Sequence, residues 1–172
     1  MRALISIGSN LDDPIENCRR AIEMLNQKLV SVSSLYQTSP VETIDEQGFY
    51  INISAIIETA EDPIGLLRSL QGIEDYFDRR RPHFHAARTM DIDIISIEEI
   101  ELDAGPLIVP HPRSSLRLFV LLPTYEIASE LAVKLASPEA LQFLRVLEVG
   151  ESIVAKLDAE VQEITRISDA SL

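Results

Sequence analysis

Short apolar runs alternate along this chain with stretches in which apolar residues recur every three or four positions. The β-prone runs lie at Arg2–Ile7, Val30–Tyr36, Tyr50–Thr59 and Met90–Ile97, and they predict four strands. Helical spacing begins at Pro14 and at Pro63, each directly after an aspartate, which predicts two amphipathic helices. The order strand, helix, two strands, helix, strand is typical of an α+β, ferredoxin-like βαββαβ core. We expect a mainly antiparallel sheet, helices packed on one face, and long loops that form a site.

The rest of the chain has a weaker pattern. It predicts a short strand at Leu107–Val109 and a partly helical segment at Ser115–Ile127. From Glu139 to Ile167 the sequence is amphipathic and charged, and Gly150 divides it into two segments that could be helical or extended. That region contains no chemical motif, so we interpret it as structural. Without repeats or a linker, residues 1–172 are expected to form a single domain.

Composition narrows the classes of partner. With 46% hydrophobic residues the chain can form a core, and with 15 Lys and Arg against 28 Asp and Glu its net charge is −13. Such a surface repels nucleic acids and anionic membranes, so we expect neither as a partner, and a polyanionic ligand would need a local cluster of cations. The single cysteine, Cys18, and the absence of a long apolar segment lead us to expect a cytoplasmic protein.

Two carboxylates stand out on the predicted strand at Met90–Ile97. Asp91 and Asp93 are two residues apart, so their side chains should project from one face of the strand, about 6–7 Å apart. Hard oxygen ligands at this spacing suit Mg²⁺. The alternative is a half-exposed strand whose solvent face is simply acidic, which is the commoner meaning of an isolated Asp-x-Asp pair.

The segment just before this strand is the basic cluster of an acidic chain. It contains Arg79, Arg80, Arg81 and Arg88 and has neither a helical nor a strand period. Arginines beside metal-binding carboxylates are suited to a polyphosphate, because phosphoryl transfer depends on positioning and on charge neutralisation. The alternative is a solvated turn that offsets neighbouring aspartates.

Two polar residues further along could also contact phosphate. His111 lies between two prolines, which fix the backbone around the imidazole, and Arg117 follows six residues later. The alternative for His111 is a loop residue bonded to nearby backbone. Two aromatic residues, Tyr50 and Phe119, could enclose a flat heterocycle whose edge the Asn52 amide would read, although ordinary core packing explains many aromatic residues.

Together these segments resemble the 6-hydroxymethyl-7,8-dihydropterin pyrophosphokinase family. The matching pieces run in order from about residue 3 to 130, at 7–11, 36–40, 49–52, 73–79, 88–94 and 110–121. The most specific signal is Arg88-Thr89-x-Asp91-x-Asp93 followed by Pro-His-Pro around His111. The segment after about residue 130 adds nothing to this resemblance.

The resemblance implies that a pyrophosphoryl group moves from ATP to the hydroxymethyl group of the pterin, giving AMP and the pterin diphosphate in folate biosynthesis. It implies two Mg²⁺ ions, ATP as co-substrate and a monomer. The residues that it implies are Arg79, Arg88, Asp91 and Asp93 for catalysis, with the two aspartates as metal ligands; Gln71, Glu74, His111 and Arg117 for ATP; and Thr38, Pro40, Tyr50, Asn52 and Phe119 for the pterin.

The chain also departs from the family pattern near the implied site. Where the family commonly has Trp-Gly-Pro before the arginine at 88, this chain has His85-Ala86-Ala87, and a usual glycine is replaced around Val41-Glu42. These departures leave two alternatives open, a paralogue that acts on another pterin and a non-catalytic pterin- or nucleotide-binding module. A third is an unrelated ferredoxin-like interaction domain. Mg²⁺-dependent ATP turnover separates the enzymes from the binding proteins.

Overall fold

The structure is a computed structural model that describes residues 1–40, 47–77, 89–144, 150–157 and 160–168. Its first part contains β1 (Arg2–Ser9), α1 (Pro14–Leu25), η1 (Asn26–Lys28), β2 (Leu29–Val32), β3 (Leu35–Thr38), β4 (Tyr50–Glu58) and α2 (Pro63–Tyr76). The second part contains β5 (Asp91–Ile97), β6 (Leu102–Ala104), β7 (Leu107–Val109), η2 (Ser114–Leu116), α3 (Leu118–Ile127), α4 (Ser129–Leu135), α5 (Pro138–Leu141), β8 (Ser152–Leu157) and β9 (Glu160–Ser168).

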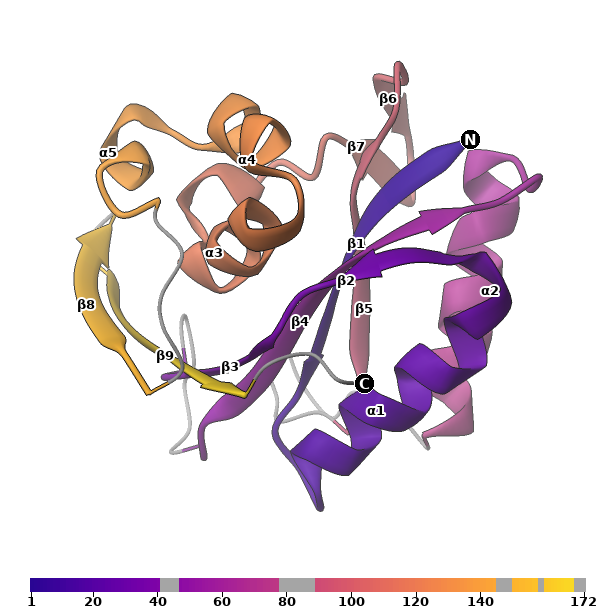
Figure 1. Ribbon diagram of the computed structural model, residues 1–172. Coiled ribbons are helices and arrows are strands. Elements are labelled where there is room, and N and C mark those ends of the chain that lie inside the picture. The colour runs from indigo at the N-terminus through magenta and orange to yellow at the C-terminus, as the bar shows by residue number, and fades with distance from the viewer. Residues whose placement is uncertain (41–46, 78–88, 145–149, 158–159, 169–172) are drawn as a thin grey trace.

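One antiparallel sheet organises the molecule. Its seven strands have the order β5-β1-β4-β3-β9-β8, with β2 also paired to β4, and a separate small sheet joins β6 to β7. The α+β class and the antiparallel sheet with helices are therefore confirmed. The expectation that helices pack on one face is wrong, because α1 and α2 cover one face while α3 and α4 lie on the other (Figure 1).

The reason for two covered faces is visible in β1. Ile5 and Ile7 belong to the hydrophobic cluster that includes α1 and α2, whereas Leu4 packs with Ile95 and with Val120 of α3. A strand with helices on both faces reads as a continuous apolar run, not as an alternating one. In the sequence, the consecutive apolar residues Ala3, Leu4 and Ile5 are such a signal.

The predicted strand at Val30–Tyr36 is in fact two strands. β2 and β3 pair with different parts of β4, and the serines between them interrupt the ladder. Ser33 keeps the contact across the interruption, since its amide donates to Ser54 O at 2.9 Å and its hydroxyl accepts from Ser54 N at 3.0 Å. Small hydroxyl side chains can replace backbone partners in this way, which lets the edge of the sheet bend.

Both predicted helix starts are confirmed. Asp13 caps α1 by accepting a hydrogen bond from Glu16 N at 3.1 Å, and Asp62 caps α2 by accepting from Gly65 N at 2.8 Å. In each helix a proline occupies the first position, where a missing amide proton costs nothing. None of the helices in the described part of the chain is long and apolar enough to cross a membrane.

The structure shows which parts of the chain after Ile127 are helical and which are extended, a choice that the sequence left open. Two short helices, α4 and α5, come first, and Gly150, with φ +85°, precedes the paired strands β8 and β9. We call these two strands the C-terminal hairpin. It extends the large sheet beyond β3 and curves around the side of α3 (Figure 1).

Candidate active site

The two predicted metal ligands lie on β5, the edge strand of the large sheet. In the pairing of β5 with β1, Asp91 is opposite Gly8 and Asp93 is opposite Ser6. Both aspartates are half-buried while the residues that alternate with them, Ile92 and Ile94, are buried. The two carboxylates therefore share one face of the strand, as the spacing predicted, and are partly exposed to solvent.

The outer edge of β5 is covered by polar groups from two other elements. Glu74 of α2 is 4% exposed, and its carboxylate accepts a hydrogen bond from Ile92 N at 2.8 Å. On the same strand, Ile95 O accepts from the amide of His111 at 2.8 Å. These contacts satisfy edge groups that would otherwise be open to another strand. They also fix the part of β5 that carries both aspartates.

Glu74 and Gln71 were both predicted to contact ATP. Gln71 is exposed on α2, whereas Glu74 is buried and supports β5. A role for either side chain in nucleotide binding stays a prediction.

His111 is held by its own turn. Its carbonyl accepts from both the amide (3.0 Å) and the hydroxyl (2.8 Å) of Ser114, and its Nδ1 accepts from Arg113 N at 3.3 Å. Since Nδ1 is an acceptor, the ring proton of the neutral imidazole is on Nε2. The other imidazole nitrogen is thus a donor of the kind that a phosphate oxygen accepts.

Electrostatics show which charged groups surround this imidazole. Burial lowers the pKa of His111 below its usual value; the carboxylate of Asp93 opposes this shift, Arg117 and Arg113 add to it, and Asp91 opposes it more weakly. Two aspartates of β5 and two arginines of the 113–117 segment are therefore close enough to the ring to influence its charge. The structure thus brings the predicted residues Asp91 and Asp93 of β5 near His111 and Arg117 of a second segment.

Arg117 lies between η2 and α3, next to one of the predicted aromatic residues. Its guanidinium carbon is 5.4 Å from the centroid of the Phe119 ring, a cation–π distance. Phe119 is half-buried and packs beside the cluster formed by Leu4, Ile95 and Val120. The ring thus combines core packing with a face that contacts a site arginine.

A second group of predicted residues lies on β3 and β4. The Asn52 amide donates to Thr38 Oγ1 at 2.8 Å, and both residues are buried. The Tyr50 hydroxyl donates to Gln47 Oε1 at 2.8 Å, and Tyr50 itself is half-buried, as is Pro40. The structure brings Thr38 and Asn52 into contact, and their role in pterin binding stays a prediction.

Gly8 connects the two groups, and its role was not predicted. It pairs with Asp91 on one side and with Asn52 on the other, and a Cβ at Gly8 would lie 3.0 Å from Asn52 Oδ1. A glycine inside a strand often marks a close approach, so its position near the end of the first apolar run was the available signal.

A hydrogen-bonded cluster around Thr89, two residues before Asp91, was also missed. Ser9 Oγ donates to Thr89 O at 2.7 Å, and the Asn17 amide reaches both Ser9 Oγ (3.3 Å) and Thr89 O (3.4 Å). Within the described residues, the buried Thr89 Oγ1 has no hydrogen-bond partner. An unsatisfied buried hydroxyl beside a site is where a bound group or a water completes the hydrogen bonding. Ser9 and Asn17 lie more than seventy residues from Thr89, so no spacing in the sequence indicates these contacts.

The described donors fit Mg²⁺ better than a metal held by protein ligands alone. No group of three or more His, Cys, Asp or Glu side chains that could hold a metal occurs among the residues the structure describes. Mg²⁺ keeps several waters and is commonly bound by one or two carboxylates together with substrate phosphates. Asp91 and Asp93, partly exposed on one strand face, meet that requirement.

Some predicted residues lie outside the described part of the chain. These are the catalytic candidates Arg79 and Arg88, and the departures from the family pattern at His85-Ala86-Ala87 and Glu42. Their roles stay predictions.

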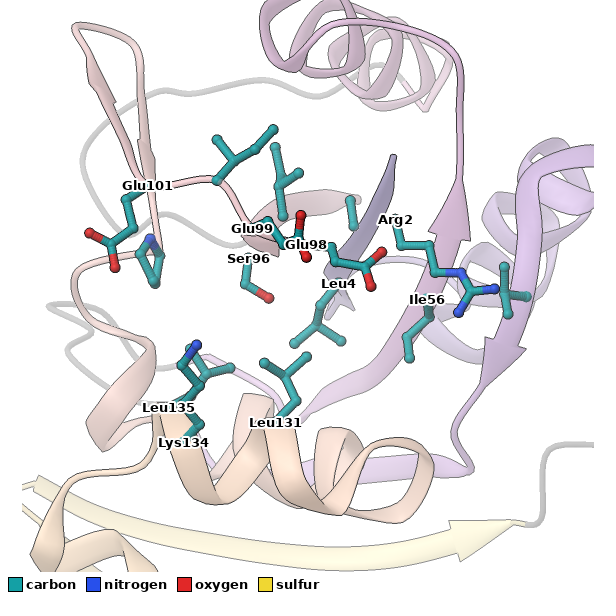
Figure 2. A pocket seen from close by; sticks show the side chains of 15 residues that line it. Arg2, Leu4, Ile56, Ser96, Glu98, Glu99, Glu101, Leu131, Lys134 and Leu135 are labelled. Atoms are coloured by element: carbon teal, nitrogen blue, oxygen red, sulfur yellow. The ribbon is translucent and has the colours of Figure 1, made fainter.

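A cavity elsewhere in the molecule contains none of the predicted site residues. It has a volume of about 730 Å³ and is lined by residues such as Leu4, Ser96, Glu98 and Leu131 (Figure 2). In the β1–β5 pair, Leu4 is opposite Ser96, whereas the aspartates lie toward the other end. The cavity and the aspartates therefore occupy opposite ends of the same two strands.

Comparisons with known proteins point to one family. The family profile described as 7,8-dihydro-6-hydroxymethylpterin-pyrophosphokinase (HPPK) matches residues 4–129. The 2-amino-4-hydroxy-6-hydroxymethyldihydropteridine pyrophosphokinase of Bacillus subtilis is 36% identical over 141 residues, which are 80% of this chain and 84% of that protein. The bifunctional protein FolKE of Lactococcus lactis subsp. cremoris is 32% identical over 174 residues, covering 93% of this chain and 49% of that protein.

The fold has solved counterparts as well. A crystal structure of Plasmodium falciparum HPPK-DHPS A437G with SDX-DHP aligns with a TM-score of 0.55 and 13% identity, covering 89% of this chain and 48% of that one. At that identity the likeness concerns the fold alone. The match of the family profile over most of the chain, with relatives above 30% identity, shows that this chain belongs to the 7,8-dihydro-6-hydroxymethylpterin pyrophosphokinase (HPPK) family.

Proposed function

We propose that this protein transfers a pyrophosphoryl group from ATP to the hydroxymethyl group of 6-hydroxymethyl-7,8-dihydropterin in a Mg²⁺-dependent reaction of folate biosynthesis. The observation that carries the proposal is the row Asp91–Gly8–Asn52, in which β1 separates the two proposed substrate sites. Adjacent strands are about 4.8 Å apart, so a carboxylate and an amide two strands apart can serve two substrates that react with each other.

On the nucleotide side, Asp91 and Asp93 would hold Mg²⁺, which supplies charge neutralisation of the phosphates when bound. His111 would donate from Nε2 and Arg117 from its guanidinium to the phosphates or the nucleoside, since both lie in the electrostatic group around the aspartates. Arg79 and Arg88 would stabilise the charge on the transferred group, and Gln71 and Glu74 would complete the nucleotide site.

On the pterin side, Tyr50 and Phe119 would stack on the ring and Asn52 would bond its edge. Thr38, the last residue of β3, would orient the Asn52 amide that it bonds, and Pro40, two residues further on, would complete the pterin site. This arrangement leaves Asn52 Oδ1 beside Gly8, where the missing side chain gives a flat ligand access.

The reaction is a substitution at the β-phosphorus of ATP. The pterin hydroxymethyl oxygen forms a bond to that phosphorus, the bond to the bridging oxygen of the α-phosphate breaks, and AMP leaves while the hydroxyl proton passes to solvent or a base. Alignment of the two substrates supplies much of the acceleration of such a step. We further propose a ferredoxin-like arrangement for β1, α1, β2–β3, β4, α2 and β5, and a cytoplasmic monomer.

The test is AMP release from ATP and Mg²⁺ with and without 6-hydroxymethyl-7,8-dihydropterin. We expect pterin-dependent AMP from the wild type and a loss of ~10³-fold in Asp93→Asn, because the variant keeps the shape but loses the charge of a metal ligand. The matched control is Asp103→Asn, an exposed aspartate on β6, which should retain wild-type activity.

Wild-type protein that releases no pterin-dependent AMP would contradict the proposal. If such protein still bound both substrates, the non-catalytic alternative would take its place. Turnover of a related pterin alcohol alone would indicate the paralogue.

A further inference from the structure

The C-terminal hairpin lies beyond the residues that the family profile matches, 4–129, yet one of its side chains reaches the proposed nucleotide site. Gln162 is on β9, opposite Ala155 of β8, and only 3% of it is exposed. A buried amide must find partners for both its donor and its acceptor, because an unpaired polar group in the interior is costly. The partners that Gln162 finds are backbone groups of the α3 start.

Gln162 contacts the backbone on both sides of Arg117. Its Oε1 accepts from Leu118 N at 2.9 Å, and its Nε2 donates to Leu116 O at 2.9 Å. The first contact satisfies one of the amide protons that a helix leaves open at its start, since Arg117, the N-cap residue of α3, makes no capping bond with its side chain. The Gln162 side chain thus replaces the missing cap and also donates a hydrogen bond to the carbonyl of Leu116.

These two hydrogen bonds fix the backbone conformation of Arg117. Arg117 has φ −97° and ψ 97°, an extended conformation between η2 and α3. Both of its flanking peptide groups are held by the same amide, so the direction in which its side chain leaves the backbone is fixed as well. From there the guanidinium lies over Phe119 and contributes to the charge around His111.

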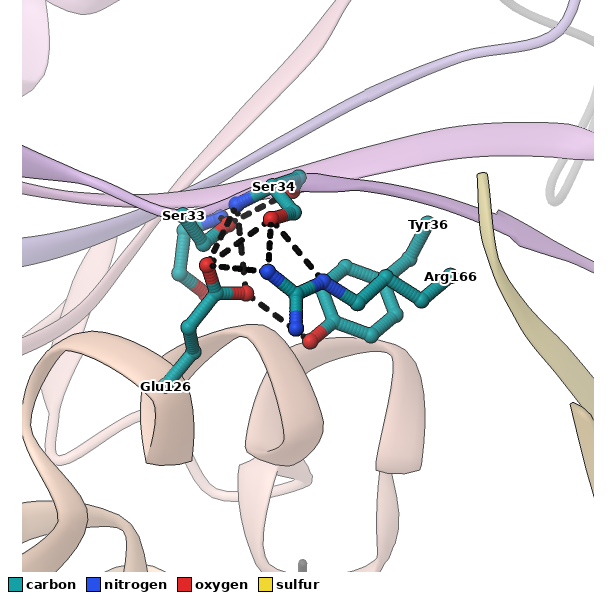
Figure 3. Close-up of polar contacts among 6 residues, drawn as sticks. Ser33, Ser34, Tyr36, Glu126 and Arg166 are labelled. Carbon is teal, nitrogen blue, oxygen red and sulfur yellow. Dashed lines mark hydrogen bonds and ion pairs between the residues drawn. The ribbon is translucent and has the colours of Figure 1, made fainter. Parts of the chain in front are cut away.

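The hairpin that carries Gln162 is itself firmly attached. Arg166 of β9 bonds to Ser34 Oγ at 2.8 Å and forms an ion pair with Glu126 of α3 at 3.4 Å, and Glu126 also accepts from the Tyr36 hydroxyl at 2.9 Å (Figure 3). Next to Gln162, Glu163 O accepts from Ser39 N and Glu163 N donates to Ser39 Oγ, each at 2.9 Å. The buried amide is therefore held relative to both α3 and β3.

We propose that Gln162 is a positioning residue for nucleotide binding, which pre-orients Arg117 toward ATP through the peptide groups of Leu116 and Leu118. The proposal rests on the proposed function, in which Arg117 contacts ATP. It gives the C-terminal hairpin a specific task in the site: a rigid support for one cation, so that less freedom is lost when ATP binds.

The experiment measures binding of α,β-methylene-ATP with Mg²⁺ by calorimetry in a double-mutant cycle. This analogue cannot react, because the bridge between its α- and β-phosphorus is carbon. We expect Gln162→Met, which removes both hydrogen bonds at similar volume, to weaken binding ~10-fold. In an Arg117→Ala background the same change should have an effect below about 2-fold, because the residue it acts through is gone.

Two controls separate positioning from loss of stability. Gln142→Met makes the same substitution at an exposed glutamine and should leave the affinity unchanged. Leu157→Ala weakens the hydrophobic packing of the hairpin without touching the amide and, below its unfolding temperature, should also bind the analogue normally. Hydrogen exchange at the Leu118 amide should accelerate in Gln162→Met and not in Leu157→Ala.

Wild-type affinity in Gln162→Met, or equal losses with and without Arg117, would overturn the proposal. Failure of the proposed function has a different signature: wild-type protein that binds the analogue but releases no pterin-dependent AMP. In that case the cycle still decides whether Gln162 orients Arg117. Wild-type protein that does not bind the analogue would overturn both.

Discussion

We call the part of the molecule formed by β1–β5, α1 and α2 the body. The body and the C-terminal hairpin are held together by different kinds of contact. In the body, β1, β4, α1 and α2 are joined by a large cluster of buried aliphatic side chains, among them Ile5, Ile53 and Leu70. The hairpin shares a smaller cluster with α3 and is joined in addition by individual polar side chains, Gln162 and Arg166. Apolar packing tolerates exchange among similar residues, whereas a hydrogen-bonded amide or guanidinium depends on one residue type.

Matched deletions in the two clusters test this difference, and the deletion in the larger cluster should have the largest effect on stability. Ile53 and Ile164 are both 0% exposed, the first in β4 and the second in β9. We expect Ile53→Ala to lower the free energy of unfolding by about 4 kcal/mol through lost burial and a cavity. Ile164→Ala should cost about 2 kcal/mol, because the hydrophobic cluster around Ile164 is smaller and leaves less packing to lose.

Denaturant unfolding gives both free energies, and hydrogen exchange in β9 and β4 shows whether the hairpin opens alone. Equal losses for the two variants, with equal exchange in both strands, would mean that the hairpin and the body unfold as one unit.

Breaking the ion pair that attaches the hairpin to α3 should have the next largest effect on the free energy of unfolding. The side chains of Glu126 and Arg166 are 18% and 13% exposed, and Glu126 also accepts from Ser34 and Tyr36. Removing the carboxylate leaves a mostly buried cation and three donors, the Ser34 amide and hydroxyl and the Tyr36 hydroxyl, without this partner. Glu126→Ala should therefore cost about 3 kcal/mol. In the wild type, burial raises the pKa of the Tyr36 hydroxyl and the neighbouring Glu126 charge raises it further, so Tyr36 stays protonated as a donor.

The control is the exposed pair of Arg2 with Glu58, at 4.0 Å and with side chains 56% and 62% exposed. There Glu58→Ala should change the free energy of unfolding by less than about 0.5 kcal/mol. Thermal unfolding of both variants checks the contrast, and similar losses would show that burial does not distinguish the two pairs.

The same difference explains how far the fold could be predicted from the sequence. The helices at Pro14 and Pro63 and the strands β1, β4 and β5 were predicted because apolar periodicity and cap residues are local signals. The strands β2 and β3 were predicted as one strand. The second helical layer was missed, although the consecutive apolar residues Ala3–Ile5 indicated it. The hairpin was left undecided, because its position depends on Gln162, Arg166 and Glu126, which look like ordinary surface residues in a sequence.

For the site, the sequence supplied residue types, and the fold supplied their neighbours. Asp91 and Asp93 were found by strand spacing, and resemblance to a family connected them to His111 and Arg117. Sequence spacing could not show that Gly8 separates Asp91 from Asn52, because this follows from the register of three strands. The role of Gln162 could not be predicted for the same reason, since its hydrogen-bond partners are more than forty residues away in the sequence.

Gly8→Ala tests whether the close approach of Gly8 to Asn52, within the body, is needed for pterin binding. The added Cβ would lie 3.0 Å from Asn52 Oδ1, closer than most carbon–oxygen contacts, so the amide must shift. We expect the KM for the pterin to rise ~10-fold with little change in the KM for ATP, the opposite of the Gln162→Met pattern. Gly72→Ala on α2, where a Cβ meets nothing within 4 Å, is the matched control and should leave both constants unchanged. A rise in the KM for ATP alone would mean that Gly8 serves the nucleotide side.

The smallest effect concerns the electrostatics of the body alone. Glu61 has a lowered pKa because of its hydrogen bond from Lys28, at 2.7 Å, with further bonds from Ser69 and Thr59. A carboxyl whose pKa is lower in the folded than in the unfolded state stabilises the fold above its unfolded pKa of about 4.3 and loses that contribution as the pH falls through the folded pKa. The unfolding free-energy difference between wild type and Glu61→Gln should therefore be larger at neutral pH and shrink at acidic pH. Because Lys28 and Glu61 are about one-third exposed, salt should reduce the neutral-pH difference as well. A difference that is independent of pH and salt would indicate that the charge of Glu61 does not stabilise the body. The hydrogen bonds of Glu61 would then contribute without its charge, in contrast to the charged contact between Glu126 and Arg166 of the hairpin.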